Sequence, residues 1–340
     1  MPEALPCPPV STTSPPTIAA LAPDARFVPF HEVNGRAHIV VDGPSGPGTV
    51  LGLSHWPTGG TPTSLEADTS AEIVFRYLDA QHDAPAVHIV TNNHFDEDGL
   101  LAAYLLLEQP SDRALWAAAI AAAEAGDFQT WTDPRAVWSA MTLMAMAERT
   151  TSPVPDVLRA LNGARGTDPA GAITIALLPY VERVLREPER YRRLWERQWA
   201  IVERDIAMIE SGAATVTEVD GCDLAVVCAP HPLSPFAVHP RIDAMRVLTA
   251  TPDGIISLEH RYETWVRYIS RRLAPRRDLT GVLHELDAQA ARPGRWRFDG
   301  IDHPQARLRF TDERGAATVS GMTDRQITDI VCDHESPANR

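Results

Sequence analysis

The sequence predicts an α/β fold in two domains, with a smaller mixed α+β domain in the second position. The chain has 340 residues, which is more than one domain usually holds. Residues 49–56 and 86–93 are apolar segments typical of buried strands, and each precedes a helical stretch. Beyond residue 211, short strand-like segments alternate with turns. We therefore expect an N-terminal α/β unit, a helical middle region and a β-rich C-terminal unit.

The charged residues exclude several function classes. The chain holds 31 basic and 45 acidic residues, for a formal net charge of −14, which argues against binding to duplex nucleic acid or an anionic membrane. Every basic residue is arginine, so a Schiff-base lysine, a P-loop lysine and a Ser-Lys dyad are excluded. The absence of a GxSxG motif leaves Ser-His-Asp catalysis without support.

The cysteines and the hydropathy predict where the protein resides. Cys7, Cys222, Cys228 and Cys332 form neither a CxxC pair nor a recognisable disulfide framework, so we expect inert thiols in a reducing compartment. No segment approaches the roughly 18 apolar residues that span a bilayer, and the N-terminus lacks the pattern of a signal peptide. These features predict a cytoplasmic protein without a membrane partner.

The N-terminal region contains an arm, a turn and a first strand. Residues 1–25 are rich in proline and hydroxyl side chains and predict a disordered arm without chemistry. Asn34-Gly35 favours a type I′ turn, so the flanking segments are interpreted as a hairpin. The strand at 49–56 precedes a helix that runs to about residue 80 and begins with Thr69 and Glu72 at the spacing of a capping box.

The remaining elements divide the chain into an arm at 1–25, a metal-binding and helical domain at 26–211 and a C-terminal domain at 212–335. Residues 111–211 are expected to be mainly helical, with one strand at 173–178 and a clear amphipathic helix at 189–210. In the C-terminal domain we expect strands at 215–219, 224–229, 246–251 and 255–262 and helices at 278–291 and 323–332.

The strongest chemical signal is His94-x-Asp96-x-Asp98, which follows the strand at 86–93 and precedes a helix. In extended backbone, residues at i, i+2 and i+4 share one face, so the three side chains can converge on one point. Imidazole and carboxylate ligands suit Mn²⁺ or Mg²⁺, and Zn²⁺ or Fe²⁺ remain alternatives. Gly99 permits close backbone approach, and the helix N-terminus favours a phosphate.

A simpler interpretation is that Asp96 and Asp98 cap the helix and that His94 is an ordinary loop residue. The compact set of one imidazole and two carboxylates after a strand favours a metal site.

The segment VTNNHFDEDGLLAAY, residues 90–104, resembles the first motif of the DHH phosphoesterase superfamily, in which a strand ends in His-x-Asp-x-Asp-Gly before a helix. The resemblance implies a DHH-like α/β domain, two metal ions, usually manganese, and His94, Asp96 and Asp98 as catalytic metal ligands. It also implies hydrolysis of a phosphoester or phosphoanhydride by activated water. The Asp-His-His string of the superfamily and its glycine- and histidine-rich signature are absent, so the chain represents a divergent branch.

The second motif of that superfamily suggests Asp127, in Ala-Gly-Asp-Phe at 125–128, as a further metal ligand. A two-metal site needs a bridging carboxylate, whereas the alternative is a normal helix stop.

Two other functions remain open. A non-catalytic protein that keeps the DHH-like fold would use the cleft to bind a ligand. Phe95-Asp96-x-Asp98-Gly99 also resembles the first motif of the haloacid-dehalogenase-like phosphatases, but Leu100 replaces the expected threonine and the later lysine of that family is absent.

Further histidines are predicted to border the substrate. His55 ends a strand as His94 does, so His55 and Asp68 are expected beside the same site, and His231, His239 and His260 are candidates from the second domain, although loop histidines are common. The expected partner is a small phosphorylated substrate or a short oligonucleotide, and a homodimer is compatible with the sequence. A basic cluster is interpreted either as a polyphosphate clamp or as a solvated face: Arg267, Arg271, Arg272, Arg276 and Arg277.

Overall fold

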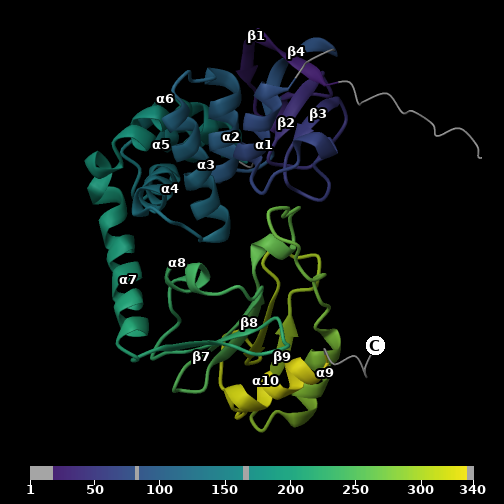
Figure 1. Ribbon diagram of the computed structural model, residues 1–340, viewed down its shortest axis with the longest axis vertical. Helices are drawn as coiled ribbons and strands as arrows, with labels where there is room; N and C mark the ends of the chain where they lie inside the picture. The colour runs from purple at the N-terminus through teal and green to yellow at the C-terminus, as the bar shows by residue number, and fades with distance from the viewer. Residues whose placement is uncertain (1–17, 81–83, 164–167, 335–340) are drawn as a thin grey trace, which may run out of the picture.

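The computed structural model describes residues 18–80, 84–163 and 168–334. Two β-sheets lie at opposite ends of the molecule, and helix α7 (Arg192–Glu210) runs along one side between them (Figure 1). The first sheet is entirely parallel, with the order β1-β4-β2-β3. The α/β class is therefore confirmed. Its strands are β1 (Ala19–Phe27), β2 (His38–Val41), β3 (Thr49–Leu53) and β4 (Ala84–Thr91).

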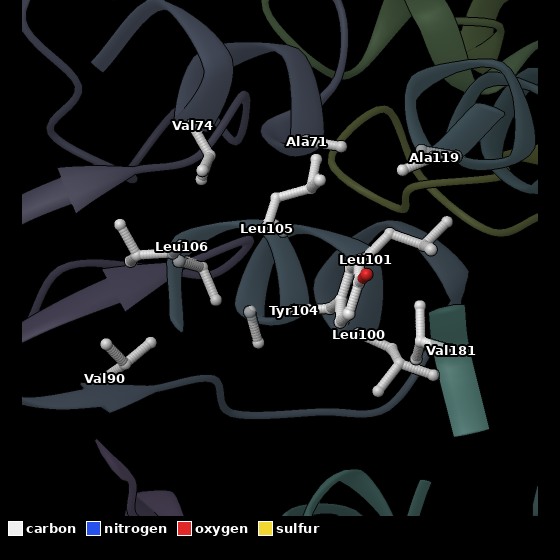
Figure 2. Close-up of a cluster of buried hydrophobic side chains, with 14 of the residues drawn as sticks. Ala71, Val74, Val90, Leu100, Leu101, Tyr104, Leu105, Leu106, Ala119 and Val181 are labelled. Carbon is white, nitrogen blue, oxygen red and sulfur yellow. The ribbon is translucent and has the colours of Figure 1, made fainter. Parts of the chain in front are cut away.

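Helices α1 (Ser70–Asp79) and α2 (Glu97–Glu108) pack against this sheet and against each other. Thr69 caps α1 by accepting a hydrogen bond from the Glu72 backbone, as the sequence predicts. Helix α2 is apolar on all sides, which is the pattern of a helix enclosed by other elements. Figure 2 shows its central leucines among side chains of α1, β4, α3 (Arg113–Phe128) and α6 (Ala170–Arg186). Four of these leucines are at most 1% exposed: Leu100, Leu101, Leu105 and Leu106.

The middle region is helical. Helix α7 presents Trp195 and Trp199 to helix α4, where Trp138 stacks on Trp195 with ring centroids 4.4 Å apart. These tryptophans belong to a hydrophobic core, as their helical spacing predicts. The other helices of the region are α3 (Arg113–Phe128), α4 (Pro134–Ala147), α5 (Pro155–Gly163) and α6 (Ala170–Arg186).

The second sheet is mixed, with the order β5-β6-β7-β8-β10-β9, and only the β6–β7 pair is parallel. Helices α9 (Thr280–Gln289) and α10 (Asp324–Asp333) share a hydrophobic core with this sheet. The strands are β5 (Thr215–Glu218), β6 (Ala225–Cys228), β7 (Arg246–Ala250), β8 (Ile256–His260), β9 (Arg295–Phe298) and β10 (Arg307–Thr311). Short helical segments are α8 (Pro235–Val238) and the 3-10 turns Phe30–Glu32, Thr63–Leu65, Pro188–Tyr191, His239–Arg241 and Tyr262–Thr264.

Four sequence-based expectations were wrong. The arm cannot extend to residue 25, because β1 begins at Ala19, whereas residues 1–17 lie outside the described part. No hairpin forms at Asn34-Gly35, because β2 pairs in parallel with β3 and β4. Residues 173–178 lie inside α6, and strands β9 and β10 were not anticipated.

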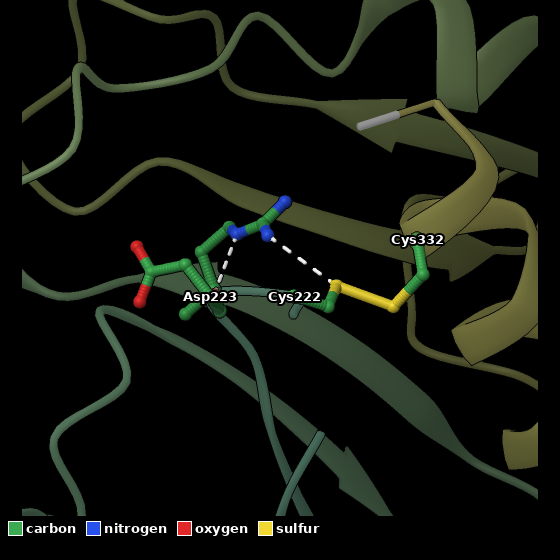
Figure 3. The surroundings of a disulfide bond; sticks show 4 residues. Cys222, Asp223 and Cys332 are labelled. Atoms are coloured by element: carbon green, nitrogen blue, oxygen red, sulfur yellow. Dashed lines mark hydrogen bonds between the residues drawn. A yellow bond between two sulfur atoms is a disulfide. The ribbon is translucent and has the colours of Figure 1, made fainter. Parts of the chain in front are cut away.

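The cysteines are also not all free. Cys222 and Cys332 form a disulfide that joins the β5–β6 turn to α10, and Cys228 is free (Figure 3). The two paired residues are 110 positions apart in the sequence, so no short spacing motif indicates that they pair. The expectation of a reducing compartment depended on unpaired cysteines, so this disulfide removes its support. In the described part of the chain, no helix has the length and apolarity needed to cross a bilayer.

Candidate metal centre

Three strands of the first sheet deliver polar side chains to one edge. Asp42 follows β2, His55 comes shortly after β3, and His94 comes shortly after β4. Because the strands are parallel, their carboxyl ends meet at the same edge, where ligands of α/β sheets bind. Asp96 and Asp98 then enter α2, and Asp127 lies in the last turn of α3. We call these six residues the acidic cluster.

The first group of possible ligands consists of Asp42, His94 and Asp96. Nε2 of His94 lies 2.6 Å from Oδ2 of Asp96 and 3.2 Å from Oδ2 of Asp42. Nδ1 of His94 donates a hydrogen bond to Oδ1 of Asn93 at 3.1 Å, which leaves Nε2 for a metal ion. The ligand atoms of this group lie within 4.8 Å of one another.

The second group consists of Asp42, His55 and Asp98, again with ligand atoms within 4.8 Å. Nε2 of His55 lies 3.3 Å from Oδ1 of Asp42, 3.8 Å from Oδ2 of Asp98 and 3.4 Å from Oδ2 of Asp127. Nδ1 of His55 donates to the carbonyl of Asp68 at 2.6 Å, so Nε2 faces the carboxylates. Asp42 therefore belongs to both groups.

Local backbone geometry fixes these side chains. Both oxygens of Asp98 accept hydrogen bonds from the first two amides of α1, those of Ser70 and Ala71. A Cβ at Gly99 would lie 2.1 Å from the Asn92 side chain and 3.2 Å from Oδ2 of Asp42, so only glycine fits there. Asp42 has a φ of 43°, a left-handed conformation that aspartate tolerates better than most residues.

The electrostatics of the cluster favour a bound cation. Burial, together with the charge of Asp42, raises the pKa of Asp98 to about 7. Burial and the charge of Asp98 raise the pKa of Asp127 well above its usual value. Burial alone would raise the pKa of Asp42, but its hydrogen bonds with His55 and His94 outweigh burial and hold that pKa well below the usual range. Without a metal, the carboxylates thus depend on imidazolium partners.

The same partnership raises the pKa values of both histidines. Burial alone would lower the pKa of His94, but the charge of Asp96 and hydrogen bonds with Asp42 and Asp96 raise it to about 11. Burial likewise opposes protonation of His55, whereas its hydrogen bond with Asp42 and the charge of Asp98 raise its pKa to about 8. Two divalent ions would offset the four carboxylates completely and leave both imidazoles neutral, as ligands must be.

Several buried polar atoms in the cluster are partnered only by ion pairs within it. Oδ2 of Asp42, Nε2 of His55 and Oδ2 of Asp127 are buried, and no well-directed hydrogen bond supplements these ion pairs. Buried polar atoms normally have well-directed hydrogen bonds, so atoms of this kind that converge on one point indicate a site for an ion or ligand. Carboxylate oxygens and imidazole nitrogens are a donor set that fits Mn²⁺ or Mg²⁺.

Comparison with known families places the chain in one of them. A model described as a family of unknown function (DUF6687) matches residues 23–334. This chain belongs to the DUF6687 family. No curated protein and no solved structure matches it. The matched segment includes the second sheet, the first sheet except for the beginning of β1, and the whole acidic cluster of this DUF6687 chain.

The segment at 262–270 of this DUF6687 member lies against the acidic cluster. The Tyr262 ring makes an edge contact with His55 at a centroid distance of 5.8 Å, and Trp56 contacts both His94 and Trp265 at 5.0 Å. The Arg267 amide donates to the carbonyl of His55 at 2.7 Å. The segment at 262–270, which follows β8 of the second sheet, therefore covers one side of the cluster.

Asp68 lies beside His55, but its carboxylate contacts the segment at 262–270. Its Oδ1 accepts hydrogen bonds from the backbone amides of Ile269 and Ser270, at 2.6 and 3.0 Å, and its carbonyl orients His55. Asp68 thus joins the two parts of the chain and supports the cluster indirectly.

The three histidines expected from the second domain do not join the cluster. His231 lies 3.2 Å from Asp205 of α7, and Nδ1 of His239 donates to the Phe128 carbonyl at 2.8 Å. His260 lines a separate small pocket with arginines. Among the described residues, none of these histidines has a hydrogen bond or ion pair with the acidic cluster.

Sequence reasoning missed Asp42 and Tyr262. The signal for Asp42 was an apolar run, His38–Val41, followed directly by Asp42-Gly43. The hairpin interpretation made β2 antiparallel to its neighbours. It therefore placed Asp42 at the opposite edge of the sheet from His94. Tyr262 carries no local signal, since only the packing of the second sheet brings it to His55.

Proposed function

We propose that the protein is a divalent-metal-dependent hydrolase of phosphoester or phosphoanhydride bonds, with two Mn²⁺ or Mg²⁺ ions in the acidic cluster. The observation that carries this proposal is the position of Asp42. Its Oδ2 lies 3.2 Å from Nε2 of His94, in the group that contains Asp96. Its Oδ1 lies 3.3 Å from Nε2 of His55, in the group that contains Asp98. A shared carboxylate between two ligand groups is the arrangement that two-metal phosphoryl chemistry requires.

The chain supplies a complete set of ligands for two ions. His94 and Asp96 would hold one ion, His55, Asp98 and Asp127 the other, and Asp42 both. Divalent ions at such a site lower the pKa of water and offset the charge that develops on phosphoryl oxygens. Asn93 and the Asp68 carbonyl keep the two Nε2 atoms directed at the cluster.

The accessible side of the cluster indicates where a substrate would enter. The side chains of His94 and Asp96 are 28% and 26% exposed, whereas those of Asp42, His55 and Asp98 are at most 1% exposed. Trp56 packs on His94 at this side, and its indole Nε1 is buried without a partner. That N–H group can donate to a phosphoryl oxygen, and the Trp56–Trp265 pair offers aromatic surface for a base.

The haloacid-dehalogenase-like alternative has less support. Leu100 stands where that motif has threonine, and the chain has no lysine. Asp98 is also fully buried and accepts hydrogen bonds from the first two amides of α1, so its carboxylate has little access to a substrate.

The experiment uses the purified full-length chain. Bound metal would be measured by elemental analysis after dialysis against Mn²⁺, and hydrolysis would be assayed on pyrophosphate, cyclic dinucleotides and short oligonucleotides. We expect about two ions per chain and Mn²⁺-dependent turnover of at least one substrate. A chain that binds no divalent metal contradicts the proposal. Metal and ligand binding without turnover would instead support the non-catalytic alternative.

A further inference from the structure

A second cluster of titratable side chains lies in the second sheet, away from the acidic cluster. It surrounds a cavity of about 40 Å³ next to the ends of β7 and β8. We call it the arginine pocket. None of its lining residues belongs to the acidic cluster, so the inference drawn from it is independent of the proposed function. The polar lining residues are Asp223, Arg246, His260, Thr264, Arg276 and Arg277.

Guanidinium groups dominate the charged lining of the pocket. Arg246 is 2% exposed, and its guanidinium donates to the Asp223 carbonyl at 2.9 Å and contacts Sγ of Cys222 in the disulfide at 3.8 Å (Figure 3). Burial and the charge of Arg277 lower the pKa of Arg246 to about 10, although Asp223 opposes this. The Asp223 carboxylate accepts a hydrogen bond from the Met245 amide. One carboxylate thus lines the pocket beside three guanidinium groups.

Two buried polar atoms of the pocket lack partners. Arg276 donates its terminal N–H groups to the carbonyls of Ile301, His303 and Pro304, yet its Nε is buried without an acceptor. His260 is 2% exposed, and its Nε2 is also buried without a partner. A donor and a ring nitrogen therefore remain unsatisfied in one cationic cavity, which indicates a ligand that can both accept and donate.

The state of His260 determines what that ligand must be. Burial and the charges of Arg276 and Arg246 lower the pKa of His260 to about 3, against a hydrogen bond with the Arg277 backbone. The imidazole is therefore neutral, and because Nε2 has no partner, we assign its single proton to Nδ1, the nitrogen left to bond the Arg277 backbone. The unpartnered Nε2 is then a hydrogen-bond acceptor, surrounded by guanidinium donors.

We propose that the arginine pocket binds a small oxyanion that carries one proton, of the hydrogen-phosphate class. The guanidinium groups face the charged oxygens, and Nε2 of His260 accepts the hydrogen bond of the acid's hydroxyl group. Since one water needs about 10–15 Å³ of such space, the cavity of about 40 Å³ has room for a small free ion. Sulfate has the same shape without the proton, so it would leave Nε2 unpaired and opposed to an oxygen.

The test is calorimetric titration of the full-length chain with inorganic phosphate and with sulfate, after chelation of divalent metals and at constant ionic strength. We expect one phosphate per chain and sulfate affinity at least about tenfold weaker, as loss of a charge-assisted hydrogen bond implies. Equal binding of the two anions, or no phosphate binding by the folded chain, would overturn the proposal.

Variants then locate the anion. His260→Leu removes the acceptor, and Arg277→Gln removes a charge at a less buried position in case the first variant fails to fold. Each is expected to weaken phosphate binding by about tenfold or more. Arg272→Gln serves as a matched control on the same segment, because Arg272 is exposed and does not line the pocket. Phosphate binding that survives in Arg277→Gln but disappears in Asp42→Asn would place the anion at the acidic cluster and contradict the proposal.

Discussion

Oδ2 of Asp42 lies 3.2 Å from Nε2 of His94, although the two residues follow different strands of the first sheet. The contact exists because β2 and β4 are adjacent and parallel, so both end at the same edge. The other oxygen of Asp42 lies 3.3 Å from His55, which follows β3 on the other side of β2. Asp42 thus lies between His55 and His94, at the end of the middle one of three parallel strands.

Asp42→Asn should weaken Mn²⁺ binding by more than about 100-fold, because loss of even an indirect partner of a metal ligand costs about 10–100-fold. The substitution keeps the size of the side chain and removes the charge shared by the two ligand groups. Calorimetric titration with Mn²⁺ checks this. Asp79→Asn, at the exposed end of α1, is the control and should bind metal as the parent chain does.

Asp127→Asn should stabilise the metal-free protein and should reduce the stabilisation that metal binding provides. Because the pKa of Asp127 is raised in the folded state, its ionisation at pH 7 opposes folding, and removal of the charge should add on the order of 1 kcal/mol to the free energy of unfolding. Urea unfolding in the presence of a chelator measures this change in the free energy of unfolding. In Mn²⁺ the parent chain should gain more stability than the variant. A variant less stable than the parent under both conditions would show that Asp127 has a packing role instead.

Gly99→Ala should destabilise the protein by about 1–3 kcal/mol, because its Cβ would lie 2.1 Å from the Asn92 side chain and displace it. The displacement should also lower metal affinity, since Asp42 and Asp96 lie next to the same atom. Gly163→Ala is the matched control, because a Cβ there meets no atom of the described residues within 4 Å. Thermal unfolding and Mn²⁺ titration of both variants provide the comparison, and equal melting temperatures would refute the steric explanation.

His239→Asn should reduce the sensitivity of the protein to acid. Burial, together with the charge of Arg261, lowers the pKa of His239 to about 4. The unfolded state therefore binds the proton first, and stability is lost as pH falls from 6.5 to about 4, by up to about 3 kcal/mol. Asparagine can still donate to the Phe128 carbonyl but has no such titration. Urea midpoints across this pH range should fall less steeply in the variant than in the parent chain.

Cys222→Ser should lower the free energy of unfolding by about 2–5 kcal/mol, because the disulfide with Cys332 closes a long loop and holds α10 on the second sheet. Thiol labelling of the unreduced, denatured chain followed by peptide mapping should leave Cys222 and Cys332 unlabelled and label Cys228. Cys228→Ser, at the free cysteine, should change stability much less. Four reactive thiols in freshly purified protein would contradict the pairing.

Local pattern predicted most secondary structure correctly but did not predict strand pairing. The Thr69 cap, the stripe of α7 and the strands β5 to β8 agree with their expected positions. Asn34 and Gly35 adopt the expected positive φ values of 53° and 71°, yet no hairpin forms. Turn chemistry acts over a few residues, whereas the partner of β2 depends on apolar faces far away in sequence. The Cys222–Cys332 disulfide was missed for the same reason.

The sequence by itself determined the core of the candidate site. His94 and Asp96 are two residues apart, and local geometry brings them into contact. Asp98 does not share their extended face, as the spacing had predicted, because it lies inside α2 and joins His55 in the other ligand group. The tertiary structure decided the rest, because Asp42, His55 and Asp127 reach this point from two other strand ends and from the last turn of α3. Only the parallel order of the strands and the packing of α3 bring these charges together, and neither is encoded in the spacing of any short motif.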